Sequence, residues 1–202
     1  MSSIIIDGIS NTGKTTLIKN IQTKIIETGK YKYSNFFISE HLTERFFEEK
    51  NVNVDMVAEH IINILNIIKS LNDFHANSPF SSKNIVRIYI ERLFATFYSR
   101  GLLTEEFFIK NGELISSLRI RHILLYISKN DLKNRLEETF KTRNDIWKNY
   151  VNANGGISKF VDDLLNKQDI MLNFSETILS KYVNSETISV SNIDDNFYNS
   201  MV

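Results

Sequence analysis

Short apolar runs alternate with longer amphipathic segments along the whole chain. The runs are rich in β-branched or aromatic residues, and each is short enough to form one buried strand. They cover residues 3–7, 35–39, 84–91, 122–128 and 187–190. Strands that alternate with helical segments favour a parallel sheet with helices on both faces. The pattern therefore predicts an α/β fold with three layers, α/β/α.

The segments between these runs carry apolar residues three and four positions apart, the spacing of a helix with a buried face. Residues 14–28 show this pattern, and residues 55–74 have an apolar face broad enough to pack on two sides. Gly155-Gly156 is the clearest break in the chain, and another long helix is predicted to begin after it. Further helical pieces are predicted from about residue 92, over 103–120 and over the highly charged residues 129–153.

The most specific feature lies between the first predicted strand and the first predicted helix. The pattern G-x-x-x-x-G-K-[ST] is matched there in full by Gly8-Ile9-Ser10-Asn11-Thr12-Gly13-Lys14-Thr15. The two glycines let the backbone N–H groups point at phosphate oxygens, and the following helix adds its positive end. The lysine of this motif reaches the β- and γ-phosphates, and the hydroxyl after it is placed for Mg²⁺. We therefore predict a nucleotide-binding loop made by Gly8, Asn11, Thr12, Gly13, Lys14, Thr15 and Thr16.

Charged residues follow two of the predicted strands. The third run ends in Glu91 and is followed by Arg92, and in a parallel sheet that end lies beside the phosphate loop. There Glu91 can hold Mg²⁺ through water, and Arg92 can bind an acceptor phosphate with two hydrogen bonds. The alternative is an ordinary ion pair at a strand end. The second run is followed by Glu40, a candidate general base or hydrogen-bonding group for the acceptor.

Two arginines in the charged segment 129–153 are candidates for contact with a phosphoryl group. Arg135 and Arg143 are eight residues apart, so about two helical turns place them on nearly one face. Such a helix can close over ATP and bring guanidinium groups to the transferring phosphoryl, whose charge needs neutralising in a dry site. The alternative is a solvated helix whose arginines pair with Glu137 and Glu138.

A second motif, Asn166-Lys167-Gln168-Asp169, has the form N-K-x-D that reads guanine in GTPases. That motif belongs in a loop after a strand, whereas here the apolar residues keep a helical period through it. No D-x-x-G follows the phosphate loop, so the γ-phosphate switch residue of GTPases is missing. We interpret this motif as a solvated helix face.

Composition narrows the remaining choices. The chain has 202 residues with 24 Lys plus Arg against 24 Asp plus Glu, so a basic surface that coats nucleic acid is not expected. It has no cysteine, which excludes disulfides and thiolate metal sites, and its four histidines show no metal-ligand spacing. No run of about eighteen apolar residues predicts a membrane span, and the first residues lack the features of a signal peptide. We therefore expect a cytoplasmic protein.

The segments that carry these features cover most of the chain and are residues 4–16, 36–44, 88–98, 122–143 and 187–195. Together they resemble the thymidylate kinase and deoxynucleoside kinase branch of the P-loop nucleoside and nucleotide kinases. The resemblance implies a five-stranded parallel sheet flanked by helices, in a single kinase domain over residues 1–202 with a lid at about 129–155. It also implies a loop against adenine at 187–195 and, as is common in this family, a homodimer.

By the same resemblance, Glu91-Arg92 corresponds to the family's pair that handles Mg²⁺ and the acceptor phosphate, and Glu40 to the acid after the second strand. The sequence departs from the family at three positions. His41 stands where deoxynucleoside kinases usually have Pro, and Leu93 where they usually have Ser. Ser128 stands where thymidylate kinases often have Asp. These departures leave the identity of the acceptor open.

Our first hypothesis is a kinase that moves the γ-phosphate of ATP·Mg²⁺ to a nucleoside monophosphate, thymidylate-like in kind, or to a deoxynucleoside. A monophosphate acceptor needs no strong base, whereas a nucleoside hydroxyl needs Glu40 or Glu91 to take its proton. The alternatives are a kinase of a small non-nucleotide alcohol on the same scaffold, and a nucleotide-binding regulator without turnover. The residues assigned to the kinase are Lys14 for the phosphates, Thr15 and Glu91 for Mg²⁺, Arg92 for the acceptor, and Arg135 or Arg143 for the transition state.

Overall fold

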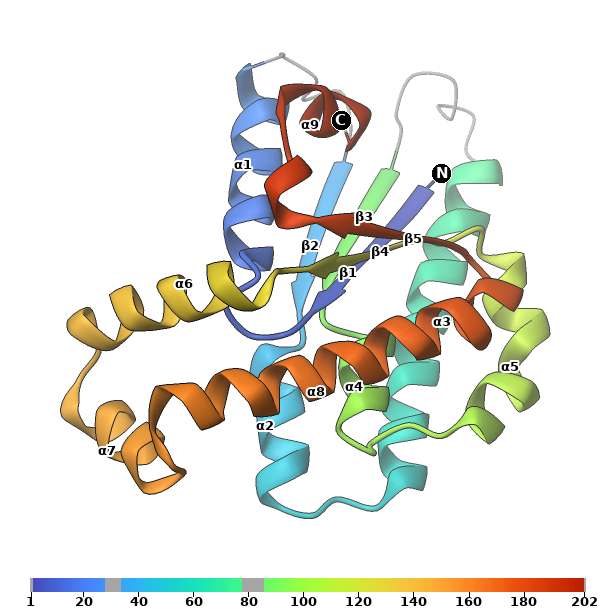
Figure 1. Ribbon diagram of the computed structural model, residues 1–202. Coiled ribbons are helices and arrows are strands. Elements are labelled where there is room, and N and C mark those ends of the chain that lie inside the picture. The colour runs from blue at the N-terminus through green and yellow to red at the C-terminus, as the bar shows by residue number, and fades with distance from the viewer. Residues whose placement is uncertain (1, 28–33, 78–85, 202) are drawn as a thin grey trace.

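Five parallel strands form the centre of the computed structural model, which describes residues 2–27, 34–77 and 86–201 (Figure 1). The strands are β1 (Ser2–Gly8), β2 (Ser34–Ser39), β3 (Val86–Glu91), β4 (Arg121–Tyr126) and β5 (Asn184–Ser189). Their order in the sheet is β2-β3-β1-β4-β5, so β1 lies between β3 and β4. Each neighbouring pair is parallel, which confirms the predicted five-stranded parallel sheet.

The helices α1 (Lys14–Glu27) and α3 (Val54–Asn77) begin and end within three residues of the predicted ranges 14–28 and 55–74. Of the predicted ranges, residues 28, 84 and 85 lie outside the described residues. Two short 3₁₀ turns, η1 (Leu179–Lys181) and η2 (Val190–Asn192), flank β5. The α-helices are α1 (Lys14–Glu27), α2 (His41–Glu49), α3 (Val54–Asn77), α4 (Phe94–Ser99), α5 (Glu105–Ser117), α6 (Lys129–Thr142), α7 (Asp145–Ala153), α8 (Gly156–Thr177) and α9 (Asp195–Met201).

Helices cover both faces of the sheet because side chains alternate between the two faces along each strand. On β1, Ile5 faces the larger apolar core, which α3, α4, α5 and α8 complete. Ile4 and Ile6 face a smaller core beneath α1 and α9. The result is the predicted three-layer α/β/α arrangement. None of the helices in these described ranges has the length and apolar character needed to cross a membrane.

The sequence pattern does not predict α9, because the groups that anchor this helix lie far away in the chain. The hydroxyl of Tyr89, on β3, donates to the backbone O of Met201 at 2.7 Å. The Nδ2 of Asn20, on α1, donates to the hydroxyl of Tyr198 at 2.9 Å. Residues 187–195, for which the resemblance implies a loop against adenine, include the end of β5, η2 and the first residue of α9.

The charged segment after β4 is helical, as predicted, but it forms two helices instead of one. The first, α6, ends before Arg143. The side chain of Asn144 then caps α7 by accepting the backbone N–H of Trp147 at 3.0 Å. Gly155 and Gly156 have φ angles of +93° and +80°, in the region that favours glycine, and they make the turn into α8.

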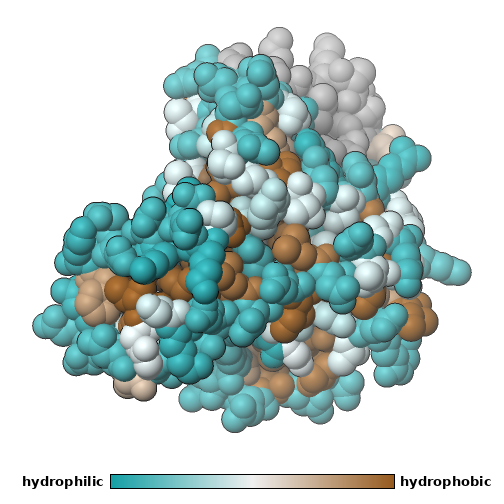
Figure 2. Space-filling view, in the orientation of Figure 1, coloured by the Kyte–Doolittle hydropathy of each residue, from teal (hydrophilic) through white to brown (hydrophobic). Residues whose placement is uncertain are grey.

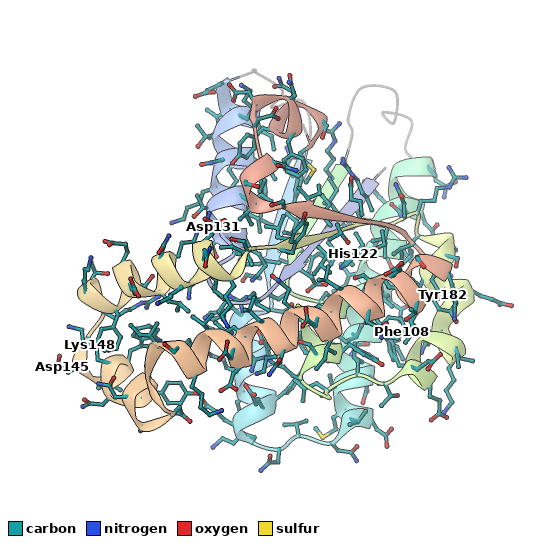
Figure 3. The ribbon with its side chains drawn as sticks, viewed as in Figure 1. Phe108, His122, Asp131, Asp145, Lys148 and Tyr182 are labelled. Atoms are coloured by element: carbon teal, nitrogen blue, oxygen red, sulfur yellow. The ribbon has the colours of Figure 1, made fainter. Side chains whose placement is uncertain are left out.

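The helices α6 and α7 project from the body of the molecule at the carboxyl edge of the sheet, and the first half of α8 runs beside them (Figure 1). We call residues 129–155 the arm, and Asp145 and Lys148 mark its far end in Figure 3. Aromatic rings join the arm to α8, with centroids 5.9 Å apart for Phe140 and Trp147 and 6.2 Å apart for Trp147 and Phe160. Figure 2 shows apolar surface between α6 and α8, bordered by hydrophilic side chains.

Candidate nucleotide-binding site

The phosphate loop joins the end of β1 to the start of α1, and its path requires both glycines of the motif. Gly8 has a φ of +145°, and a Cβ at this position would lie 2.6 Å from the backbone O of Leu125. Gly13 has a φ of +91°. Within the loop, the hydroxyl of Thr12 donates to the backbone O of Ile9 at 2.9 Å. A side chain at either glycine would therefore strain or displace the loop.

Lys14 begins α1, and its side chain is folded back into the loop, where it is only 2 % exposed. Its Nζ donates to the backbone O of Gly8 at 2.6 Å and of Ile9 at 2.7 Å. Burial, and then the neighbouring charge of Arg92, lower the pKa of Lys14 to about 7. The ammonium group is therefore held where phosphate oxygens can replace these carbonyls as its acceptors.

A hydroxyl and a carboxylate lie side by side at the edge of the loop. Thr15 Oγ1 donates to Glu91 Oε1 at 3.0 Å, and Ser39 Oγ donates to Glu91 Oε2 at 3.4 Å. Such oxygens suit Mg²⁺, which usually takes one or two carboxylates and leaves its other positions to phosphates and water. The described ranges contain no group of three or more His, Cys, Asp or Glu that could hold a metal ion alone. Thr16 lies exposed in the first turn of α1.

A chain of alternating carboxylates and guanidinium groups continues from Glu91 away from the loop. Arg92, in a left-handed conformation with φ +66°, places Nε 3.3 Å from Glu91 Oε1 and Nη1 3.2 Å from Glu44 Oε2. Glu44, on α2, is fully buried and its other oxygen pairs with Nε of Arg100. Arg100 also pairs with Glu48, which ends the chain. We call these five residues the acidic–basic chain; it holds two arginines and three carboxylates, a net charge of −1.

Glu40 follows β2 and lies beside the end of β3, since its backbone N–H donates to the backbone O of Glu91 at 3.1 Å. Its carboxylate is nearly buried, and Oε2 lies 2.9 Å from Nε2 of His60 on α3. The neighbouring His41 begins α2, and its Nδ1 is buried with no hydrogen-bond partner among the described residues. Burial, and then the nearby arginines, lower the pKa of His41.

The two arginines of the arm lie in different places. Arg135 Nη1 donates to the backbone O of Asn11 in the phosphate loop at 3.1 Å. A Cβ on Gly13 would lie 3.5 Å from the same Nη1, so this guanidinium borders the loop. Arg143 instead follows the last residue of α6, is exposed, and lies 6.0 Å from the ring centre of Trp147. The expectation that both arginines share one helix face is therefore wrong, because the helix ends before the second.

The N-K-x-D motif lies in the middle of α8, as the helical period predicts. One of its residues is not solvated, however. Gln168 is buried, its Oε1 accepts the backbone N–H of Ile127 at 2.9 Å, and its Nε2 donates to the backbone O of Ile127 at 3.1 Å. Because Ile127 comes just before α6, this amide fixes the base of the arm to α8. The interpretation as a solvated face is therefore wrong for this residue.

Asp7 is a structural centre that the sequence reasoning did not single out. This fully buried residue precedes Gly8, and its carboxylate accepts the backbone N–H groups of residues 93–96 at 2.9–3.2 Å and the Thr96 hydroxyl at 2.6 Å. It also lies 3.1 Å from Nε2 of His122, the second residue of β4 (Figure 3), whose Nδ1 is 2.9 Å from Ser185 Oγ. The signal in the sequence is one carboxylate at the end of an otherwise apolar strand.

The environment of Asp7 strongly favours the ionised carboxylate. Burial by itself would raise the pKa of Asp7, but the hydrogen bonds and charge of His122, together with the bonds from Thr96 and Ala95, outweigh it and lower the pKa to about 2. The negative charge thus holds the start of α4, which directly follows Arg92 and Leu93. Asp7 therefore connects the end of β1 to the turn that carries Arg92.

The sheet order and the glycine loop between β1 and α1 define the class of this protein: it has the P-loop α/β/α fold.

No family model matches the chain, and no curated protein sequence does so either. Among solved structures, the chain is similar to the crystal structure of EHV4-TK complexed with TP4A, a herpesvirus thymidine kinase. The two are 11 % identical with a TM-score of 0.38, and the match covers 99 % of this chain and 88 % of that chain. At this level the likeness carries no argument, so the fold assignment rests on the sheet and the loop.

Proposed function

We propose that this protein is an ATP-dependent kinase that transfers the γ-phosphoryl group to a nucleoside-type acceptor. The observation that carries the proposal is the convergence of three groups at the carboxyl edge of the sheet: the Lys14 ammonium in the loop, the Thr15–Glu91 pair and the Arg135 guanidinium. Phosphoryl transfer is catalysed almost entirely by positioning and by charge stabilisation around the transferred group. Cations on two sides of the loop and an oxygen pair beside it provide that arrangement.

In this proposal the loop amides and Lys14 bind the β- and γ-phosphates of ATP. Thr15 and Glu91 would hold Mg²⁺, which when bound neutralises phosphate charge and orients the γ-phosphoryl group. Arg135 reaches the same phosphates from the arm, which would then act as a lid. The Arg143 side chain, on the ring of Trp147, lies outside this convergence.

The acidic–basic chain favours a nucleoside hydroxyl over a nucleoside monophosphate as the acceptor. A monophosphate brings about two negative charges and needs free cations to receive them. Arg92 and Arg100 are both neutralised by carboxylates, and the chain as a whole is net negative. A phosphate that drew these arginines away would leave the fully buried Glu44 without its partners, which is costly for a buried charge.

With a hydroxyl acceptor, transfer requires a base for one proton. The acceptor O–H bond breaks as its oxygen bonds to the γ-phosphorus, and the bond from that phosphorus to the β-phosphate oxygen breaks to leave ADP. We assign the proton to Glu40, which follows the strand beside Glu91 and reaches the same edge of the sheet. Arg92 is then a group that orients the acceptor through its carboxylate partners.

The test is ADP release from ATP and Mg²⁺ across a panel of nucleosides, deoxynucleosides and their monophosphates. Lys14→Met serves as the blank, because it keeps the length of the side chain and removes the ammonium group. We expect stimulation by at least one nucleoside or deoxynucleoside and none in the blank. Stimulation by monophosphates alone would contradict the acceptor assignment. ATP binding without stimulation by any member would contradict the nucleoside kinase as a whole and favour a non-nucleotide alcohol or a regulator.

A further inference from the structure

The two oxygens of the Glu40 carboxylate are in different situations. Oε2 lies 2.9 Å from Nε2 of His60, whereas no hydrogen bond to Oε1 is formed within the described residues. The Glu40 side chain is 8 % exposed and that of His60 is 33 % exposed. The pair therefore spans from the interior toward solvent, with one carboxylate oxygen occupied and the other available.

The contact has a defined donor, and the ring that donates is held in place. An ionised carboxylate only accepts hydrogen bonds, so Nε2 of His60 must carry the hydrogen when Glu40 is ionised. The imidazole also meets the ring of Phe47 edge to face, with centroids 5.5 Å apart at 81°. Phe47 in turn packs against Phe97, with ring centroids 6.2 Å apart. Two separate contacts thus fix the orientation of His60, and His60 fixes the carboxylate.

The two other buried glutamates of the described site, Glu91 and Glu44, have a partner on each carboxylate oxygen. Glu91 receives Thr15 and Arg92 on Oε1 and Ser39 on Oε2. Glu44 has an arginine on each oxygen, as described for the acidic–basic chain. Of these three buried glutamates, Glu40 is the one that combines one fixed oxygen with one available oxygen, which is the geometry that a general base needs.

We propose that His60 is a positioning residue for Glu40, an inference that rests on the proposed kinase function with a hydroxyl acceptor. The N–H of His60 holds Oε2, so that the proton of the acceptor hydroxyl passes to Oε1 as the new P–O bond forms. Glu40 then releases this proton to water before the next turnover. His60 does not contact the acceptor; its effect on the reaction passes through the carboxylate.

The experiment compares His60→Leu with His60→Gln, using ATP, Mg²⁺ and the best hydroxyl acceptor. Gln places an amide N–H near the position of Nε2, whereas Leu has no donor. General-base catalysis contributes about 10²–10⁴-fold, so loss of its alignment should lower kcat about tenfold to a hundredfold in His60→Leu. His60→Gln should retain most of kcat, and KM for ATP should stay unchanged in both. The matched control is Asn63→Leu, which places the same leucine on the exposed side of α3.

A merely structural role is separated by combining His60→Leu with Glu40→Gln. If His60 acts through Glu40, the added substitution costs no further turnover once the base is gone. Equal kcat for His60→Leu and Asn63→Leu would overturn the positioning role, and so would a full additional loss in the double variant. A wild-type protein that no hydroxyl acceptor stimulates overturns the proposed function itself, whereas an active wild type with an unaffected His60→Leu overturns only this inference.

Discussion

The phosphate loop and the arm both bring a cation to the place proposed for the γ-phosphate, but they hold it in opposite ways. In the loop, Nζ of Lys14 is buried and donates hydrogen bonds to two backbone carbonyl oxygens at 2.6 and 2.7 Å. On the arm, Arg135 belongs to an exposed part of α6 and reaches the loop through one hydrogen bond of 3.1 Å to Asn11. The Lys14 nitrogen is fixed in position before any ligand arrives, whereas the Arg135 guanidinium is held by a single contact.

The supports behind the two cations differ in the same way. Behind the loop lie β1, in the middle of the sheet, and the buried carboxylate of Asp7 with its row of backbone donors. Behind Arg135, α6 buries only two side chains, Leu132 and Leu136, and the base of the arm is tied to α8 by Gln168. Elements with few buried contacts open most easily. Substitutions in the loop should therefore change both the free energy of unfolding and turnover, whereas those on the arm should affect the free energy of unfolding much less.

The largest effect is expected for Lys14→Met, which should lower turnover about 10²–10³-fold, as the loss of one preorganised charge-stabilising group does in other enzymes. The same variant should have a higher free energy of unfolding than the wild type. Because burial lowers the pKa of Lys14 from 10.5 to about 7, its protonation opposes folding. The resulting loss of stability is fully present below pH 7 and disappears as the pH rises toward 10.5. Steady-state kinetics at pH 7 measures the turnover, and urea unfolding at pH 6 and 9 measures the free energy of unfolding. Unchanged turnover would contradict the assignment of Lys14 to the phosphates.

The next effect concerns two aspartates near helix starts, Asp7 on the loop side and Asp131 on the arm. Asp7→Asn places an amide among N–H donors and should lower the free energy of unfolding by about 3 kcal/mol, the cost of disrupting a buried charged network. This corresponds to about 6–12 °C in Tm. Asp131→Asn changes an exposed group that pairs with Ser128, and should cost about 1 kcal/mol or less. Thermal unfolding of both variants checks the difference.

The effect of Asp7 has a pH dependence with a definite sign. Its pKa is lowered from 3.8 to about 2 on folding, so the carboxylate stabilises the native state above pH 3.8. That contribution is lost as the pH falls through 2. The stability gap between wild type and Asp7→Asn should therefore narrow between pH 4 and pH 2, and a constant gap over this range would contradict the role of the charge.

A smaller effect separates the two arginines of the arm. Arg135→Ala should lower kcat about tenfold to a hundredfold, less than a fully enclosed arginine finger, because its contact to the loop is exposed. Arg143→Ala should lower it much less, since this side chain lies on Trp147 and away from the loop. Both should leave the free energy of unfolding within about 0.5 kcal/mol of the wild type. Equal kcat losses in the two variants would contradict the division between them.

Most of the fold can be predicted from local pattern. The strands β1 to β4 contain short β-branched or aromatic runs, and the helices have apolar residues at regular spacing, so the layers follow without long-range information. The strand β5 begins three residues before the predicted run 187–190, because its first residues, Asn184, Ser185 and Glu186, are polar. The exceptions are instructive. The helix α9 depends on a hydrogen bond from Tyr89, which lies 112 positions before Met201 in the chain. The break at Arg143 depends on the cap that the side chain of Asn144 supplies. A broken helix and an extended helical period look alike when only hydrophobic spacing is considered.

The residues of the candidate site also divide into those that local sequence predicts and those that depend on contacts distant in the chain. Lys14 and Thr15 belong to a linear motif. The position of Glu91 can be predicted because the carboxyl ends of parallel strands lie at the same edge of the sheet. Contacts between residues distant in the chain carry no such signal. Glu44 meets Arg92 over 48 positions, and Asp7 meets His122 over 115. Charges in a helical segment such as α2 are ordinary surface residues by pattern, and only the packing of α2 on the strand ends makes Glu44 a buried one.

The finest distinction between loop and arm is whether the cation changes its protonation when ATP binds. Lys14 has a pKa of about 7 among the groups of the loop, and the phosphates favour its charged form, so its pKa rises on binding. Above pH 7 the loop must then take up a proton, and ATP affinity should fall as the pH rises, by up to about tenfold per pH unit. The phosphate, whose second pKa is near 6, is already ionised at pH 8 and contributes no uptake.

Calorimetric titration of ATP at pH 8, in two buffers of different ionisation enthalpy, measures this proton directly. We expect uptake approaching one proton per ATP in the wild type and none in Lys14→Met. Arg135→Ala should weaken binding without changing the uptake, because a guanidinium stays protonated at this pH. Uptake that survives in Lys14→Met would assign the proton to another group, and its absence in the wild type would mean that the ammonium in the loop is already charged at pH 8.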